Sequence, residues 1–193
     1  MSCPNFAPLP SPANGLALVG KTLDLILAQL AGPTAIRDMV KAYGLLLPQL
    51  RADPAFAERP FDGIADLLRD LSSAPDAVLG MATGHTSLTV APALAALRWR
   101  NCFRTIQAAD MAPSKPHPAM LLQALAATGV KPENAIFVGD TTYDMEMTQA
   151  AKVRSMGVGW GYHEAERLAA AGASRVASSV DELRDCLQAL LDD

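Results

Sequence analysis

Cysteine, aromatic residues and basic charge are all scarce in this sequence, and each scarcity excludes a class of protein. The 193 residues include three cysteines, Cys3, Cys102 and Cys186, which are far apart and have no histidine or cysteine neighbours at zinc-ligand spacing. Free thiols of this kind are typical of a cytoplasmic protein without disulfides. Aromatic residues make up 5% of the chain, and a net charge of −4 leaves no basic surface for nucleic acid, which we exclude as a partner.

Long hydrophobic runs are absent as well. No stretch approaches the roughly 18 apolar residues that a membrane-spanning helix needs. The sequence Met1-Ser2-Cys3-Pro4 has no basic segment followed by an apolar one, so we expect neither a membrane partner nor a signal peptide. Half of the residues are nonetheless hydrophobic, which is enough for a substantial core. The length fits one large domain, or one domain with a small insertion.

The first part of the chain is predicted to be helical. Four prolines before Asn14 favour a loop at the start. Leucine, valine and isoleucine then recur at helical spacing over residues 16–30, and a second helix is expected from Thr34 to about Leu50. A third helix is expected to open at Asp62.

From Ala77 onward, strands and helices are predicted to alternate. The strands are expected at 77–82, 103–108, 135–138, 154–158 and 175–177, with helices at 87–97, 119–128, 145–151, 165–171 and 180–191. Repeated strand–helix units predict an α/β fold with a Rossmann-like parallel sheet and helices on both faces. His163, which follows a glycine-rich turn, is expected to cap the helix after it.

Two aspartates follow the predicted strand at 135–138. Asp140 comes directly after Gly139, and Asp144 lies four residues further along. In open α/β sheets ligands bind beyond the carboxyl ends of the strands, and a pair of carboxylates there suits a hard cation such as Mg²⁺. The alternative is a turn whose aspartate and threonine side chains only satisfy loop backbone groups.

Two further strand ends carry residues that suit an anion. Thr83, Gly84 and His85 follow one strand, and Lys115 lies in a Ser-Lys-Pro-His-Pro loop after the next. A hydroxyl beside a glycine N–H can donate to phosphate oxygens, and a lysine in a proline-stiffened loop can place its charge on the same anion. Taken singly, the threonine is more often a helix cap, and the lysine and histidine are more often solvated. Their order, each after its own strand, predicts a single crevice for phosphate and Mg²⁺.

These motifs resemble those of the haloacid dehalogenase-like hydrolases, in particular the phosphoglycolate phosphatase-like branch with a helical cap. Residues 81–85, 114–118 and 138–144 are similar to the second, third and fourth motifs of the family, and residues 19–23 to the cap segment that faces the active site. The resemblance implies an N-terminal loop and partial helical cap over residues 1–58 and a Rossmann-like hydrolase core over residues 59–193.

The resemblance also implies a role for each matching residue. Thr83 and Lys115 would bind the transferring phosphoryl group of a small phosphorylated metabolite, with Gly84 and His85 beside it. Asp140 and Asp144 would hold Mg²⁺, and Lys21 would touch the substrate. The implied activity is hydrolysis of small phosphate monoesters.

One motif of the family has no counterpart in this sequence. Members begin with a strand that ends in Asp-x-Asp-Gly-Thr, whose first aspartate is the nucleophile and second the general acid/base, whereas no acidic residue here precedes Asp24. By the resemblance, the absent strand would lie in the centre of the sheet. We therefore expect a chain without activity, in which the strands at 77–82 and 135–138 pair directly or a homo-oligomer fills the gap.

Three interpretations of this combination stay open. The chain is a shortened form of an ordinary Mg²⁺-dependent phosphatase, which we favour because the other motifs are intact. It is instead a non-catalytic relative that binds a phosphorylated metabolite or a protein. The third interpretation is a phospho-acceptor receiver domain, although its acids should precede the threonine and lysine, and here they follow.

Overall fold

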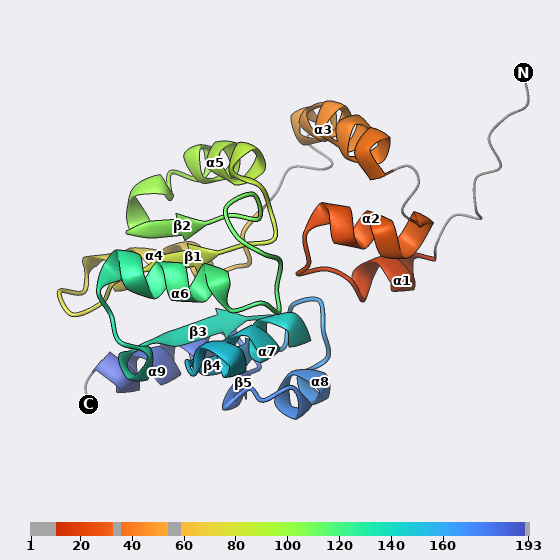
Figure 1. Ribbon diagram of the computed structural model, residues 1–193. Coiled ribbons are helices and arrows are strands. Elements are labelled where there is room, and N and C mark those ends of the chain that lie inside the picture. The colour runs from red at the N-terminus through yellow and green to blue at the C-terminus, as the bar shows by residue number, and fades with distance from the viewer. Residues whose placement is uncertain (1–10, 33–35, 54–58, 192–193) are drawn as a thin grey trace, which may run out of the picture.

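The computed structural model describes residues 11–32, 36–53 and 59–191 (Figure 1). Three helices come first, and they lie together at one side of the molecule (Figure 1). They are α1 (Pro12–Leu16), α2 (Leu23–Ala31) and α3 (Ile36–Ala52). Thr34, the expected cap of the second predicted helix, lies outside the described residues.

The single helix predicted over residues 16–30 is wrong, because residues 17–22 are not helical. Their backbone groups bond instead to side chains far along the chain: the carbonyl of Ala17 accepts from the Tyr143 hydroxyl at 3.1 Å, and the N–H of Thr22 donates to Ser114 Oγ at 2.9 Å. The loop predicted before Asn14 is also wrong in part. Helix α1 starts at Pro12, a residue suited to a first helical position, and Ser11 caps it.

The rest of the chain alternates strands and helices as predicted. The elements are α4 (Ile64–Ser73), β1 (Gly80–Ala82), α5 (Ser87–Ala96), η3 (Arg100–Cys102), β2 (Thr105–Gln107), α6 (Ala119–Thr128), η4 (Pro132–Asn134), β3 (Ile136–Gly139), α7 (Thr142–Ala151), β4 (Arg154–Val158), α8 (Ala165–Ala170), β5 (Arg175–Ala177) and α9 (Val180–Leu191). The sequence pattern therefore predicted every strand and α-helix of this part, but not the short 3-10 helices η3 and η4.

Within the described residues, the strands form two parallel sheets instead of one. Strand β1 pairs with β2, with Ala82 opposite Gln107, and β3, β4 and β5 form the other sheet in that order. The expected direct pairing of the strands at 77–82 and 135–138 is therefore wrong. The expected homo-oligomer stays a prediction.

The same layers of helices cover both sheets. On one face, Met120 of α6 and Met147 of α7 belong to one core cluster, against which Ala82 of β1 and Phe137 of β3 pack. On the other face α4 contacts α9 and η3, and Leu67 of α4 packs into the core of the second sheet. Helices thus hold the two sheets side by side. The carboxyl ends of their strands lie at the same edge of the molecule (Figure 1).

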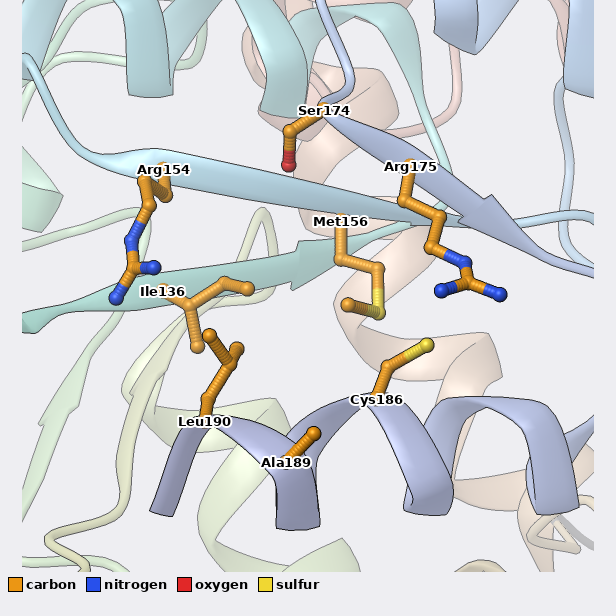
Figure 2. A pocket seen from close by; sticks show the side chains of 8 residues that line it. All are labelled: Ile136, Arg154, Met156, Ser174, Arg175, Cys186, Ala189 and Leu190. Carbon is orange, nitrogen blue, oxygen red and sulfur yellow. The ribbon is translucent and has the colours of Figure 1, made fainter. Parts of the chain in front are cut away.

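A pocket of about 270 Å³ lies at the opposite edge, beside α9 (Figure 2). Its lining includes Ile136, Arg154 and Arg175, the first residues of β3, β4 and β5. None of the site residues predicted from the sequence lines it. The residues of the candidate site lie instead at the carboxyl ends of the strands.

None of the described helices combines the length and apolar character that crossing a membrane requires. Cys102 and Cys186 are free thiols, as predicted, and Cys3 lies outside the described residues. The cytoplasmic location stays a prediction.

Candidate functional site

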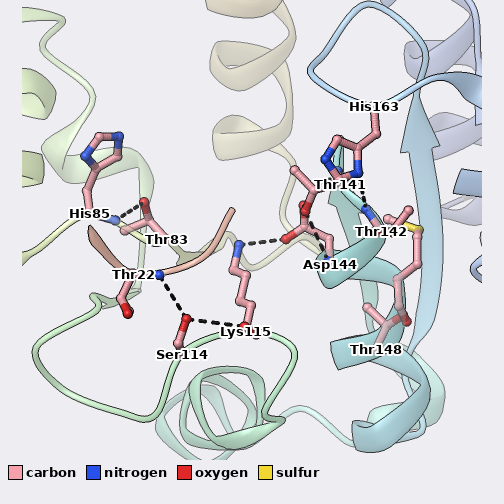
Figure 3. Close-up of polar contacts among 11 residues, drawn as sticks. Thr22, Thr83, His85, Ser114, Lys115, Thr141, Thr142, Asp144, Thr148 and His163 are labelled. Carbon is pink, nitrogen blue, oxygen red and sulfur yellow. Dashed lines mark hydrogen bonds and ion pairs between the residues drawn. The ribbon is translucent and has the colours of Figure 1, made fainter. Parts of the chain in front are cut away.

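A buried ion pair joins two of the predicted loops. Lys115, in the loop between β2 and α6, places its Nζ 2.7 Å from Oδ1 of Asp144, in the first turn of α7 (Figure 3). The two side chains are 7% and 3% exposed, so water screens the attraction little. The Lys115 ammonium also lies 5.3 Å from the centre of the Phe137 ring. The pair thereby links the loop after the first sheet to the helix after a strand of the second.

Both oxygens of Asp144 are occupied. Its Oδ2 accepts hydrogen bonds from the N–H of Thr141 at 3.1 Å and from the Thr141 hydroxyl at 2.7 Å, while Oδ1 accepts from Lys115. Thr141 in turn caps α7, because its Oγ1 accepts from the N–H of Asp144. Gly139 makes room for this arrangement, since a Cβ there would lie 2.6 Å from the Cβ of Asp144.

Asp140 is the freer carboxylate of the two. It is only partly buried, and in the described part of the chain only its Oδ2 accepts a hydrogen bond from another residue, the N–H of Tyr162 at 3.1 Å. Burial raises the pKa of Asp140, the negative charge of Asp144 raises it further, and the Tyr162 hydrogen bond acts in the opposite direction. Gly161 keeps this position open, because a Cβ there would lie 2.5 Å from Asp140 Oδ2.

The two aspartates fit Mg²⁺ in one limited way. The described residues contain no group of three or more acidic, histidine or cysteine side chains that could hold a metal. Mg²⁺ commonly keeps several waters, however, and binds through one or two carboxylates together with substrate phosphate. Asp140 can serve as such a ligand, whereas Asp144 would first have to give up a bond to Lys115 or Thr141.

Thr83 lies at the carboxyl end of β1, as predicted. Its N–H donates to the carbonyl of Gln107 at 2.9 Å, and its Oγ1 accepts from the N–H of His85 at 3.1 Å (Figure 3). Gly84 approaches residues 20–21, because a Cβ on it would lie 2.8 Å from the carbonyl oxygen of Lys21. The side chain of His85 is exposed.

Lys21 lies beside the site without reaching Lys115 or Asp144 in a hydrogen bond. Its Nζ lies 4.6 Å from the centre of the Tyr143 ring and donates to Gln29 Oε1 at 3.4 Å. The contact with Tyr143, the residue before Asp144, is a cation–π interaction. Its role with substrate stays a prediction, as do the roles of Gly84 and His85.

Sequence reasoning missed the residues that support the charged groups. Thr141 holds Asp144, Ser114 accepts from the N–H of Thr22, and His163 is 2% exposed next to Asp140. The expected cap of α8 by His163 is wrong, since its Nδ1 accepts from the N–H of Thr142 at 3.0 Å, at the start of α7. Burial lowers the pKa of His163, so the imidazole is neutral near pH 7. Only the Thr141-x-x-Asp144 spacing, a capping-box pattern, could have been read in advance.

The comparison with protein families decides the identity of the fold. The family model described as "Haloacid dehalogenase-like hydrolase" matches residues 6–158. The chain belongs to this family. The receiver-domain interpretation is thereby rejected, and the resemblance of the motifs to the haloacid dehalogenase-like hydrolases is confirmed.

Curated relatives share this sequence over part of their length. The chain is 32% identical over 133 residues to the phosphoglycolate phosphatase of Pseudomonas putida. The aligned region covers 68% of this chain and 47% of that protein. It is 32% identical over 143 residues to phosphoglycolate phosphatase 1 of Pseudomonas aeruginosa, covering 74% and 51%. The chain thus spans about half the length of the curated relatives it matches.

Solved structures support the fold of this haloacid dehalogenase-like chain. A hydrolase of the family from Streptococcus pneumoniae superimposes with a TM-score of 0.78 at 24% identity, over 94% of this chain and 84% of that one. A hydrolase from Pseudomonas syringae gives a TM-score of 0.75 at 22% identity, over 93% and 83%. The α/β fold predicted for the family is confirmed in its general form, with parallel strands and covering helices.

Replacing Asp140 or Asp144 by asparagine should change the free energy of unfolding in opposite directions. The folded-state pKa of Asp140 is raised, so its contribution to stability is fully present below the unfolded-state pKa and is lost as the pH rises through the folded-state value. Asp140→Asn should therefore raise the free energy of unfolding at pH 7 by on the order of 1 kcal/mol. This gain should shrink as the pH falls through the folded-state pKa and disappear below the unfolded-state value of about 4.

Asp144→Asn is the matched control. It breaks a buried pair, so it should lower the free energy of unfolding by about 3–5 kcal/mol. Urea unfolding at pH 7 and pH 3.5, with a chelator present to remove cations, measures both variants. Equal losses for the two variants at pH 7 would contradict the different environments of the two acids.

Gly161 and Gly159 offer a second matched pair, in the loop that faces Asp140. A Cβ at Gly161 would collide with the Asp140 carboxylate, whereas the nearest atom to a Cβ at Gly159 is 3.5 Å away. Gly161→Ala should lower the free energy of unfolding by about 1–3 kcal/mol. Gly159→Ala should change it by no more than about 0.5 kcal/mol. Urea unfolding measures both variants. An unchanged free energy of unfolding in Gly161→Ala would show that the loop moves to accommodate the added Cβ without cost.

Proposed function

We propose that this chain forms the phosphate- and Mg²⁺-binding part of a phosphatase for small phosphate monoesters similar to phosphoglycolate. The observation that carries the proposal is the buried pair of Lys115 and Asp144 at the carboxyl ends of the strands. The names of the relatives from the two Pseudomonas species supply the substrate class, and membership of the family supplies the reaction.

The Lys115 ammonium is the group that would hold the phosphate. It carries three N–H donors, of which one is used by Asp144, and no other acceptor in the described part of the chain bonds to it. Donors left over on a buried ammonium are costly unless an anion accepts from them. Thr83, at the end of the neighbouring strand, would add its hydroxyl to the same phosphate.

The two aspartates would have different roles in the site. Asp140 would hold Mg²⁺ through the carboxylate oxygen that accepts no hydrogen bond from another residue, and the bound cation would offset phosphate charge. Asp144 would act as a positioning residue, because both of its oxygens already orient Lys115 and Thr141. We propose this role for Asp144 in place of the direct metal contact implied by the resemblance.

We further propose that the chain by itself binds phosphate esters without turning them over. A covalent route needs a carboxylate free to face the phosphorus atom. Of the two acids at this site, Asp144 is held by two residues and Asp140 is assigned to the cation. The alternative interpretation, a non-catalytic binding protein, makes the same prediction for the isolated chain.

Phosphate binding is the first test of the proposal. Titration with inorganic phosphate, followed by NMR, should shift the amide signals of Thr83 and Lys115. Thr83→Val, which removes a hydroxyl donor to a charged ligand, should weaken binding about tenfold. Thr86→Val is the control and should leave binding unchanged, since the Thr86 hydroxyl bonds to Thr89 in the first turn of α5. No shift at either Thr83 or Lys115 would count against the shared crevice.

Turnover is the second test. Release of phosphate from phosphoglycolate in the presence of Mg²⁺ should be no faster with this chain than with its Asp140→Asn variant. Loss of general acid–base help alone typically costs about 10² to 10⁴ in rate. A clear Mg²⁺-dependent turnover that disappears in Asp140→Asn would refute the inactivity of the isolated chain, while leaving the phosphate site intact.

A further inference from the structure

The amino ends of β3, β4 and β5 place two arginines on the face of the sheet that α9 covers. Side chains alternate between the two faces of a strand, so residues two apart share a face. Arg154 and Met156 are two residues apart on β4. Ile136 of β3 is opposite Arg154, and Arg175 of β5 is opposite Met156. All four side chains therefore lie on one face, and they extend toward α9 (Figure 2).

This face is packed closed toward the carboxyl ends of the strands and open at the amino ends. Val158 and Ala177 belong to a buried core cluster to which α4 and α9 also contribute. Ala189 and Leu190, in the last turn of α9, instead line the pocket of about 270 Å³ described above (Figure 2). The helix and the sheet thus leave a space between them at this edge.

The pocket has an apolar wall with positive charge at its rim. Ile136 and Leu190 are partly buried and Met156 is buried, and these three side chains form the wall. Arg154 and Arg175 are exposed. No acidic side chain is among the described residues that line the pocket. Positive charge without a facing carboxylate favours an anion over a cation.

The two arginines differ in how their charge is used. Arg175 pairs with Glu182, in the first turn of α9, at 3.1 Å. Arg154 forms no ion pair with any residue that the structure describes. A guanidinium presents its N–H donors in a planar fork that matches the two oxygens of a carboxylate. Arg154 is therefore the group of this pocket that is available to an anion.

We propose that this pocket binds a small monocarboxylate with an apolar body. The carboxylate pairs with Arg154, and the apolar body lies between the sheet and α9, against Ile136 and Leu190. A doubly charged anion fits less well, because the second arginine is already paired with Glu182. At about 30 Å³ for each water-sized group, the pocket holds about nine non-hydrogen atoms, which is the size of hexanoate.

Cys186 reports on the interior of this pocket. Its thiol is free and only partly buried, and its side chain extends from α9 toward the sheet (Figure 2). A ligand between α9 and the sheet would cover it. Cys102 is also a free thiol but does not line the pocket, so it serves as an internal control.

Protection of Cys186 from alkylation tests the site with the protein unchanged. The chain is treated with iodoacetamide with and without hexanoate, and modified peptides are quantified by mass spectrometry. At about ten times its Kd, hexanoate should slow alkylation of Cys186 about tenfold, because about one site in ten is then empty. Alkylation of Cys102 should not change. Hexanol, which lacks the carboxylate, should protect Cys186 less at the same concentration.

Two variants separate the carboxylate contact from general effects of charge. Arg154→Gln removes a charged hydrogen-bond donor and should weaken hexanoate binding about tenfold. Lys131→Gln is the matched control, because Lys131 is exposed just before β3, at the same edge, and does not line the pocket. It should leave binding unchanged. In NMR spectra, hexanoate should shift the amide signal of Arg154 and leave that of Thr83, at the proposed phosphate site, in place.

Three results would overturn the proposal. The first is alkylation of Cys186 at the same rate with and without hexanoate. The second is equal protection by hexanoate and hexanol together with unchanged hexanoate binding in Arg154→Gln, which would show an apolar pocket without preference for an anion. The third is an equal loss of binding in Lys131→Gln and Arg154→Gln, which would show only general attraction of anions to this edge.

Discussion

The ion pair between Lys115 and Asp144 is the constraint on which the rest of the site depends. Lys115 comes from the loop after β2 and Asp144 from the first turn of α7 after β3, and no strand pairing connects the two sheets. A charged pair this deeply buried is costly unless its geometry is good and its remaining lone pairs are satisfied. Thr141 supplies that satisfaction through two hydrogen bonds to Oδ2. The start of α7, the lysine loop and the edge of the second sheet are therefore fixed together.

The same arrangement separates the two acids at the end of β3 into different electrostatic environments. Asp144 is neutralised by a lysine, whereas Asp140 is left with a backbone N–H and a nearby negative charge. A group kept partly desolvated beside a like charge attracts a cation or a proton. Charges that the fold does not neutralise are common at functional sites, where a bound ligand or ion neutralises them.

Much of the second part of the chain could be predicted from the sequence, because hydrophobic period and turn residues act locally. The strands at 154–158 and 175–177 and the helix at 180–191 have the expected bounds. Residues 17–22 could not be predicted, since helical spacing continues through them while hydrogen bonds to Tyr143 and Ser114, far along the chain, remove them from the helix.

The candidate site divides in the same way. Residue types and their order after successive strands predict that Lys115 and Asp144 lie close together, and the ion pair between them agrees with this. Which oxygen of which aspartate is already occupied depends on distances between loops, and the sequence does not contain them. The division into two sheets was not predicted for a related reason. The sequence of one segment indicates that it forms a strand, but which strand it pairs with depends on a second segment far along the chain.

The attachment of residues 17–22 to the core has a consequence for how such a protein can change over evolutionary time. Three of its contacts use main-chain atoms, namely the carbonyls of Ala17 and Lys21 and the N–H of Thr22. Main-chain atoms are the same for nearly every amino acid, so substitutions at Ala17 and Lys21 need not alter the position of the segment, whereas Gly20 has a positive φ and lies against Thr141. The side chains beside the proposed phosphate site can therefore diversify while the segment stays in place, so the substrate preference of the proposed enzyme could change without a change in this framework.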